Sequence, residues 1–234
     1  METLFTNCRC IQVKKASVLR IFIVRHGQTD HNRLKIMQGH LDTQLNSEGI
    51  YQAQKVGKRL ASIPLDGILS SDLKRCLQTT QEILRLQNST WGNIPSTSAL
   101  RERNMGKAEG LPLSEALKQF GPKFRDLGES REKLLERLVE EWKRIQELGI
   151  SRDYKNFLIC THGGVITNFI NHLYSDLGYC LNPSIREEQL RVPYNTSITI
   201  IDVNKITRQG TIQLFGDTLH LGTTLKIVKD QDLR

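Results

Sequence analysis

The apolar residues of this chain fall into two patterns, short runs and longer stretches in which they recur every three or four residues. A short apolar run is typical of a buried β-strand, whereas the longer spacing is typical of an amphipathic helix. By this criterion strands are predicted at residues 19–24, 67–70, 94–100, 157–160, 195–202 and 212–215. Helices are predicted from a cap at Ser47 to residue 60, and then at residues 71–86, 113 onwards, 130–148 and 165–173.

Most of the predicted strands are separated by a helix, an order that indicates an α/β fold with a mostly parallel sheet. The last two strands have no helix between them, so we expect them to be antiparallel and to lie at the sheet edge. No linker divides the 234 residues, which predicts a single domain over residues 19–234. Residues 1–18 carry no motif, and we interpret them as an N-terminal extension rather than a transit peptide.

Two of the predicted strands end in the same kind of turn, a histidine followed by glycine. The first strand leads into Arg25-His26-Gly27, and a later strand leads into Thr161-His162-Gly163-Gly164. Ligands of open α/β sheets bind at the carboxyl ends of the strands, so parallel neighbours would bring both imidazoles to one ligand. Arg25 adds a positive charge, which indicates an anion and most simply a phosphoryl group. A lone histidine here is more often an ordinary loop residue, but two matching turns favour a site.

Two further residues carry charge where local structure does not require it. Arg75 falls in the first turn of a predicted helix, although a helix N-terminus already has a partial positive charge. An anion in the same crevice explains this placement better than a surface arginine does. Glu102 lies between Arg101 and Arg103, where a carboxylate is normally ionised and structural. A bound phosphate would instead favour the protonated form that a general acid needs.

These motifs together resemble the histidine phosphatase superfamily, which includes the phosphoglycerate mutases and the fructose-2,6-bisphosphatases. The matching elements extend over residues 19–221. They are Arg-His-Gly-x-x-x-x-Asn ending at Asn32, the Gln38-Gly39 turn, Ser-x-x-x-Arg ending at Arg75, Leu-x-Glu-x-x-x-Gly around Glu102, and Thr-His-Gly-Gly at His162. The resemblance implies a three-layer α/β/α sandwich of the phosphoglycerate mutase type.

The resemblance also implies a role for each matching residue. His26 is expected to be the nucleophile and Glu102 the proton donor, with Arg25, Arg75 and His162 also counted as catalytic. The residues expected to bind the substrate phosphate are Arg25, His26, Asn32, Gln38, Gly39, Arg75, Glu102, His162 and Gly163. The implied activity is hydrolysis of a small phosphorylated metabolite through a phosphohistidine. No metal and no other cofactor are expected.

Two other functions are compatible with the same core residues. A 2,3-bisphosphoglycerate-dependent phosphoglycerate mutase would retain all of them, but the Gln38-Gly39 turn and the short segment between Gly106 and Ser130 favour a phosphatase. A catalytically idle member that serves as an interaction module would be expected to lack the nucleophile or the acid, and both are present. Loops near Gln38 and at residues 111–128 and 178–191 are expected to read the leaving group, so the sequence leaves its identity open.

Composition bears on the partners and the compartment. Lysines and arginines exceed acidic residues by eight, but no basic run with interleaved aromatic residues indicates a nucleic-acid surface. Five scattered cysteines indicate free thiols and a reducing compartment, so we expect the cytoplasm, with the nucleus as an additional location left open. No apolar segment approaches the roughly 18 residues of a membrane span. We therefore expect a small phosphorylated substrate and neither nucleic acid nor membrane as partners, and leave a homodimer open.

Overall fold

The predicted strands come together in one seven-stranded sheet in a computed structural model, which describes residues 17–87 and 91–222. The order of the strands across the sheet is β3-β2-β4-β1-β6-β7-β5. Their bounds are β1 (Val18–Arg25), β2 (Gly67–Ser71), β3 (Ser96–Thr97), β4 (Asn156–Thr161), β5 (Cys180–Leu181), β6 (Ile198–Asn204) and β7 (Gly210–Asp217). Only β6 runs against its neighbours, and the predicted mostly parallel α/β fold is confirmed.

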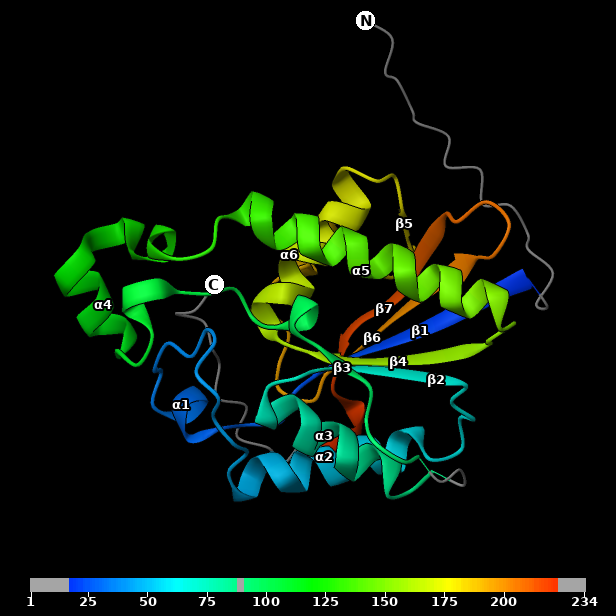
Figure 1. Ribbon diagram of the computed structural model, residues 1–234, viewed down its shortest axis with the longest axis horizontal. Coiled ribbons are helices and arrows are strands. Elements are labelled where there is room, and N and C mark those ends of the chain that lie inside the picture. The colour runs from blue at the N-terminus through cyan, green and yellow to red at the C-terminus, as the bar shows by residue number, and fades with distance from the viewer. Residues whose placement is uncertain (1–16, 88–90, 223–234) are drawn as a thin grey trace, which may run out of the picture.

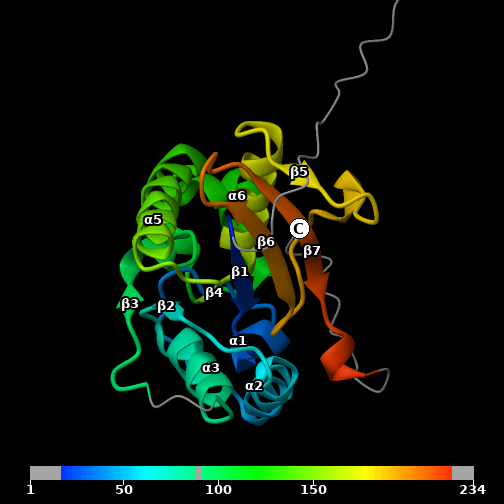
Figure 2. The same ribbon diagram turned by 90° about the vertical axis from the view of Figure 1, so that its right-hand side faces the viewer.

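Helices cover both faces of the sheet and make three layers. On one face lie α2 (Ser47–Leu60) and α3 (Lys74–Leu84), and on the other lie α5 (Arg131–Ser151) and α6 (Gly163–Ser175), as Figures 1 and 2 show. Side chains alternate between the faces of a strand, so the apolar run of β1 serves both cores. The central position of β1 therefore explains why its sequence is apolar without interruption.

The two cores can be followed through alternate residues of β1. Phe22 packs in the cluster that includes Val56 of α2 and Ile83 of α3. Ile23 packs in the opposite cluster, which includes Trp142 of α5. Each of these apolar side chains is at most 4% exposed. The sheet is thus held rigidly between the helical layers, and the turns at its carboxyl edge have a fixed base.

Short elements extend the molecule beyond the carboxyl ends of the central strands. They comprise α1 (Asp30–Arg33), α4 (Leu113–Phe120) and the 3₁₀ turns Ser98–Leu100, Gly106–Ala108 and Gly121–Leu127, with further 3₁₀ turns at Glu187–Gln189 and Leu219–Leu221. Met37, Met105 and Phe124 belong to a separate small apolar cluster that holds the segment around α4 together. In Figure 1, α1 and α4 lie on the left, past the end of the sheet.

Three local predictions differ from the structure. Asn46 rather than Ser47 caps α2, because the Asn46 side chain accepts a hydrogen bond from the Gly49 amide at 2.9 Å. The strand predicted at residues 94–100 shrinks to Ser96–Thr97, since Thr97 caps a 3₁₀ turn that follows at once. The last two long strands are antiparallel as predicted, but β5 forms the edge beyond β7, where an irregular segment was predicted.

The remaining predictions concern the cysteines, membrane spans and the N-terminus. Cys76 and Cys160 carry free, buried thiols as expected, whereas Cys180 is disulfide-bonded, so the prediction of free thiols is wrong there. Among the described residues, no helix combines the length and the apolar character that crossing a bilayer requires. The predicted N-terminal extension lies almost entirely outside the described residues.

Candidate active site

The two histidine turns lie side by side because β1 and β4 are parallel neighbours. The register pairs Arg25 with Thr161, so the next residue on each strand is a histidine. The His26 amide donates to the Thr161 carbonyl at 2.9 Å, which ties the two turns together. The ring centroids of His26 and His162 are 5.2 Å apart. Sheet register alone therefore brings together two residues that are far apart in the sequence.

The His26 ring is held in one orientation. Its Nδ1 lies 2.7 Å from the Gly27 carbonyl oxygen, which can only accept, so Nδ1 carries the proton and Nε2 keeps its lone pair. Burial, and then the positive charges of Arg75 and Arg25, lower the pKa of His26 well below its usual range. The ring is therefore neutral at neutral pH. Gly27 is required here because a Cβ would lie 2.5 Å from the Gly49 carbonyl oxygen.

Two arginines bring buried positive charge to the same place. Arg25 is 4% exposed and donates from Nη1 to the Pro193 carbonyl at 2.6 Å. Arg75 is 1% exposed and donates to the carbonyls of Gly39 at 2.9 Å and Leu41 at 2.7 Å. Burial lowers the pKa of Arg75, but a guanidinium starts so high that it stays charged. Carbonyl partners orient Arg75 without neutralising it, so its charge remains for an anion.

His162 is fully buried and does not line the cavity described below. Arg75 Nε donates to His162 Nδ1 at 3.2 Å, so the proton of the neutral ring sits on Nε2, which is 2.9 Å from Ser71 Oγ. Burial, followed by the charge of Arg75, lowers the pKa of His162 well below its usual range. In this arrangement His162 supports Arg75, and its contact with a phosphate stays a prediction.

The Glu102 carboxylate accepts two backbone hydrogen bonds. One comes from the Gly164 amide, in the first turn of α6, to Oε2 at 2.9 Å, and the other from the Arg103 amide to Oε1 at 2.9 Å. The absence of a side chain at Gly164 permits this approach, because a Cβ there would lie 2.5 Å from Glu102 Oε1. His40 Nε2 lies 2.9 Å from the Glu102 carbonyl oxygen and holds the backbone as well.

Polar side chains on the loop after β1 complete one side of the site. The Asn32 side-chain oxygen accepts from the Thr29 amide at 3.1 Å and from Asn195 at 3.3 Å, so its NH₂ group is the end left for a ligand. Sequence reasoning missed Asn195, which also donates to the His26 carbonyl at 2.9 Å. Gly39 has a φ of +47°, and its carbonyl receives Arg75. The loop therefore contributes to the position of both Asn32 and Arg75.

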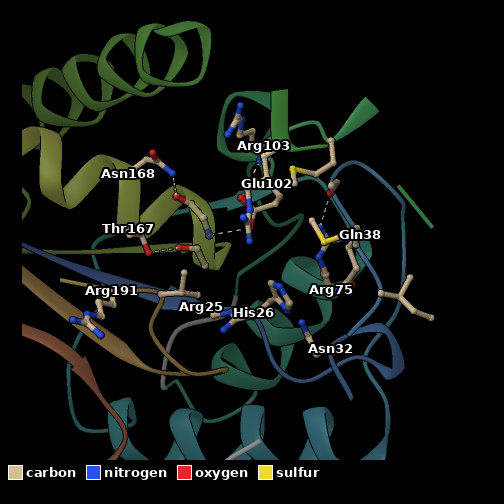
Figure 3. A pocket seen from close by; sticks show the side chains of 18 of the residues that line it. Arg25, His26, Asn32, Gln38, Arg75, Glu102, Arg103, Thr167, Asn168 and Arg191 are labelled. Atoms are coloured by element: carbon tan, nitrogen blue, oxygen red, sulfur yellow. Dashed lines mark hydrogen bonds between the residues drawn. The ribbon is translucent and has the colours of Figure 1, made fainter. Parts of the chain in front are cut away.

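These residues surround a cavity of about 580 Å³. Of the predicted site residues, the cavity wall contains Arg25, His26, Asn32, Gln38, Gly39, Arg75, Glu102 and Gly163. Figure 3 shows the first histidine with the two arginines and Asn32 gathered together, and Glu102 with Arg103 on the opposite side. One end of the cavity is thus positively charged and suited to an anion, and a carboxylate lies opposite that end.

The outer wall contains residues that the sequence motifs do not identify. Besides Thr167 and Asn168 of α6, it includes Arg103, Arg125 and Arg191. Arg125 lies over the Phe124 ring at 4.6 Å, and burial, followed by the charge of Arg103, lowers its pKa. Arg125 and Arg191 lie within the loops at residues 111–128 and 178–191 that were predicted to contact the leaving group. No periodic pattern in the sequence identifies them. The wall beyond the reacting end is therefore positively charged too.

Within residues 17–87 and 91–222, no three His, Cys, Asp or Glu side chains are placed to share a metal ion.

The sheet order, the two histidine turns and the arginine-lined cavity define a class of protein that the comparisons identify. The chain belongs to the histidine phosphatase superfamily, branch 1, whose family model matches residues 21–218, and it is a phosphatase of that superfamily. It is 38% identical over 230 residues to the broad-specificity phosphatase YOR283W of Saccharomyces cerevisiae, covering 93% of this chain and 94% of the relative. It is also 35% identical over 206 residues to the probable phosphatase C1687.21 of Schizosaccharomyces pombe, covering 87% of this chain and 95% of that one.

Solved structures share the architecture at lower identity. The phosphoglycerate mutase from Bacillus anthracis matches with a TM-score of 0.73 and 22% identity, over 89% of this chain and 98% of that one. The mycobacterial glucosyl-3-phosphoglycerate phosphatase matches with a TM-score of 0.70 and 21% identity, over 86% of this chain and all of that one. The predicted phosphoglycerate mutase-like fold is therefore confirmed.

Proposed function

We propose that this phosphatase hydrolyses small phosphorylated metabolites without a metal, through a phosphohistidine on His26 and with Glu102 as the proton donor. The observation that carries the proposal is the orientation of His26. Its Nδ1 proton is donated to the Gly27 carbonyl, so Nε2 holds a lone pair on a ring that lies near two buried arginines, Arg25 and Arg75. A neutral imidazole with one nitrogen fixed in this way is a suitable nucleophile for phosphorus.

In the first step, His26 Nε2 attacks phosphorus and the bond between phosphorus and the ester oxygen breaks. The Glu102 carboxyl group gives its proton to the departing alcohol oxygen, because an alkoxide is a poor leaving group without one. Arg25 and Arg75 neutralise the phosphoryl oxygens, and removing one such donor typically raises the barrier by about 3–4 kcal/mol in comparable sites. The negative charge of the bound phosphate favours the protonated form of Glu102 before transfer.

In the second step, water attacks the phosphohistidine and the bond between Nε2 and phosphorus breaks. Glu102, now a carboxylate, takes a proton from that water, and the lone pair returns to His26. Inorganic phosphate leaves, and both side chains regain their starting protonation states. One carboxyl group serves both steps in opposite directions, which requires that its position stay fixed throughout.

The size and charge of the cavity support a small anionic substrate. A volume of about 580 Å³ lies within the usual range for sites that bind metabolites. The outer wall carries Arg103, Arg125 and Arg191, which favour a leaving group with polar or negatively charged atoms of its own. The name of the yeast relative, a broad-specificity phosphatase, supports activity on several such compounds.

The test of this mechanism is His26→Ala, assayed by hydrolysis of 4-nitrophenyl phosphate and by trapping of phosphoenzyme. We expect loss of turnover and of the acid-labile, base-stable label that a phosphohistidine gives. His172→Ala is the matched control, since that histidine of α6 pairs with Asp176 at the end of the helix and does not line the cavity. Retained turnover in His26→Ala would exclude the proposal.

A separate assay distinguishes hydrolysis from the mutase reaction. The enzyme is incubated with 3-phosphoglycerate, with and without 2,3-bisphosphoglycerate, and both inorganic phosphate and 2-phosphoglycerate are measured. We expect any turnover of this substrate to yield phosphate. Isomerisation that depends on the bisphosphate and exceeds hydrolysis would favour the mutase.

A further inference from the structure

The segment that carries Glu102 is held by an ion pair that lies outside the cavity wall. Arg137 of α5 and Glu129, which precedes α5, form a bidentate pair with nitrogen–oxygen distances of 2.7 and 2.8 Å. Their side chains are only 20% and 14% exposed. Burial alone would raise the pKa of Glu129, but the hydrogen bonds and charge of Arg137 outweigh it and lower that pKa. The pair is thus ionised and well ordered.

Arg137 also forms hydrogen bonds with the backbone carbonyls of Ala99 and Glu102. Its Nη1 donates to the Ala99 carbonyl at 2.6 Å, and its Nη2 donates to the carbonyl of Glu102 itself at 3.2 Å. One rigid guanidinium therefore joins Glu129 to both ends of a four-residue turn. A lysine keeps the charge but cannot reproduce this fork of donors.

Glu129 forms hydrogen bonds with the two residues that follow Glu102 in the chain. Its carbonyl accepts from Arg103 Nε at 2.6 Å, and its amide donates to the Asn104 carbonyl at 2.9 Å. The Asn104 amide reaches the Glu129 carboxylate at 3.4 Å. The two partners of the ion pair thus hold the residues before and after Glu102, and neither partner lines the cavity.

We propose that the Arg137–Glu129 pair is a positioning device for Glu102 that holds the proton donor at the distance the leaving oxygen requires. The inference rests on the proposed role of Glu102 as that donor. Proton transfer needs the donor within hydrogen-bond reach, and a displacement of about 1 Å costs on the order of 100-fold in rate. The pair acts on transfer to the leaving group and leaves the binding of phosphate to other residues.

Other contacts would keep this segment folded when the pair is weakened. The Leu100 carbonyl accepts from Thr161 Oγ1 at 2.7 Å, and Arg101 makes its own bidentate pair with Asp72 at 2.7 Å. Weakening the ion pair should therefore loosen Glu102 without unfolding the chain. This permits a kinetic test.

The test is Arg137→Lys, assayed with an alkyl phosphate and with 2,4-dinitrophenyl phosphate. The value of kcat/KM reports the first step, in which the alkyl substrate needs a proton from the enzyme and the dinitrophenolate does not. We expect kcat/KM for the alkyl phosphate to fall by about 10- to 100-fold and that for the aryl substrate by less than about threefold. Equal losses on both substrates, or no loss on either, would overturn the inference.

Two further variants secure this result. Glu129→Gln preserves size but removes the charge, and it should show the same selective loss, including if Arg137→Lys folds poorly. Arg20→Lys disrupts another bidentate pair, between Arg20 of β1 and Asp202 of β6 at 2.7 Å, and should leave the ratio between the substrates unchanged. A change in the ratio in Arg20→Lys as large as that in Arg137→Lys would count against the inference.

Glu102→Gln separates this inference from the proposed function on which it rests. If Glu102→Gln loses the alkyl phosphate selectively and Arg137→Lys does not, the positioning role alone fails. If Glu102→Gln shows no selective loss, the proton-donor role fails, and the positioning role fails with it.

Discussion

Gly164 makes possible a mutation that should damage catalysis while sparing the fold. Its amide donates to Glu102 Oε2 at 2.9 Å, and a Cβ at this position would lie 2.5 Å from Glu102 Oε1. The atoms that such a Cβ would meet belong to the flexible end of a side chain. In Gly164→Ala the carboxylate should therefore move, and α6 should stay in place.

The size of that movement sets the expected loss. Ordinary contact between such atoms begins near 3.5 Å, so the carboxylate must shift by roughly 1 Å. A shift of this size in a reacting group costs about 100-fold in rate, or about 2.7 kcal/mol in the barrier. Stability should not fall, because alanine is the better helix former by up to about 1 kcal/mol. We therefore expect an enzyme with an unchanged or higher Tm and much lower activity.

The assay measures kcat/KM for an alkyl phosphate together with the Tm of the same preparation. Gly92→Ala is the matched control, since a Cβ there meets no atom within 4 Å, and it should leave kcat/KM unchanged. Full activity in Gly164→Ala would show that the observed position of Glu102 is not the reactive one. A clear fall in Tm would show that the helix moved instead, and the reasoning would be refuted.

Three other perturbations test separate parts of the site. Arg75→Gln should lower kcat/KM by about 10²- to 10³-fold in steady-state assays, because the donor that we propose for the phosphate is lost, and a loss below tenfold would contradict that role. Gly39→Ala should destabilise the protein by about 1–3 kcal/mol in urea unfolding, since φ is +47° and Glu109 occupies the space of a Cβ, and an unchanged midpoint would contradict this. Burial and the charges of two arginines lower the pKa of His26 in the folded protein. As the pH drops below the pKa of about 6.5 in the unfolded chain, the unfolded chain binds more protons than the folded one, so the free energy of unfolding decreases as the pH is lowered. The decline in Tm between pH 7.5 and 5 should therefore be shallower in His26→Gln, and parallel curves would count against it.

The reacting end of the site was predictable because its residues follow directly from strand ends. Once β1 and β4 are parallel neighbours, the register fixes where His26 and His162 lie. A short apolar run followed by a polar turn is a local pattern, and local patterns can be recognised from the sequence alone. The pairing partner of each strand still had to be assumed, and β5 was missed because a strand of two residues is too short to give an apolar pattern.

The supporting contacts were not predictable in the same way. The sequence of α5 predicts a packing helix, and Arg137 is one of many charges on its polar side. Its side chain is only 20% exposed where it binds the turn before Glu102, a contact between segments that are more than 30 residues apart in the chain. The outer arginines were missed for a related reason, since Arg125 lies in a 3₁₀ turn too short to give a period.

The position of β1 has a consequence for how the chain is made. Both strands that flank it, β4 and β6, lie in the last third of the sequence, so a ribosome releases β1 long before either partner exists. In the nascent chain both backbone edges of β1 stay unpaired and its apolar side chains stay uncovered, a state that favours aggregation and chaperone binding. Because His26 and His162 come together only when β4 pairs with β1, phosphatase activity should appear only late in folding. Its appearance would indicate that the central strands have paired.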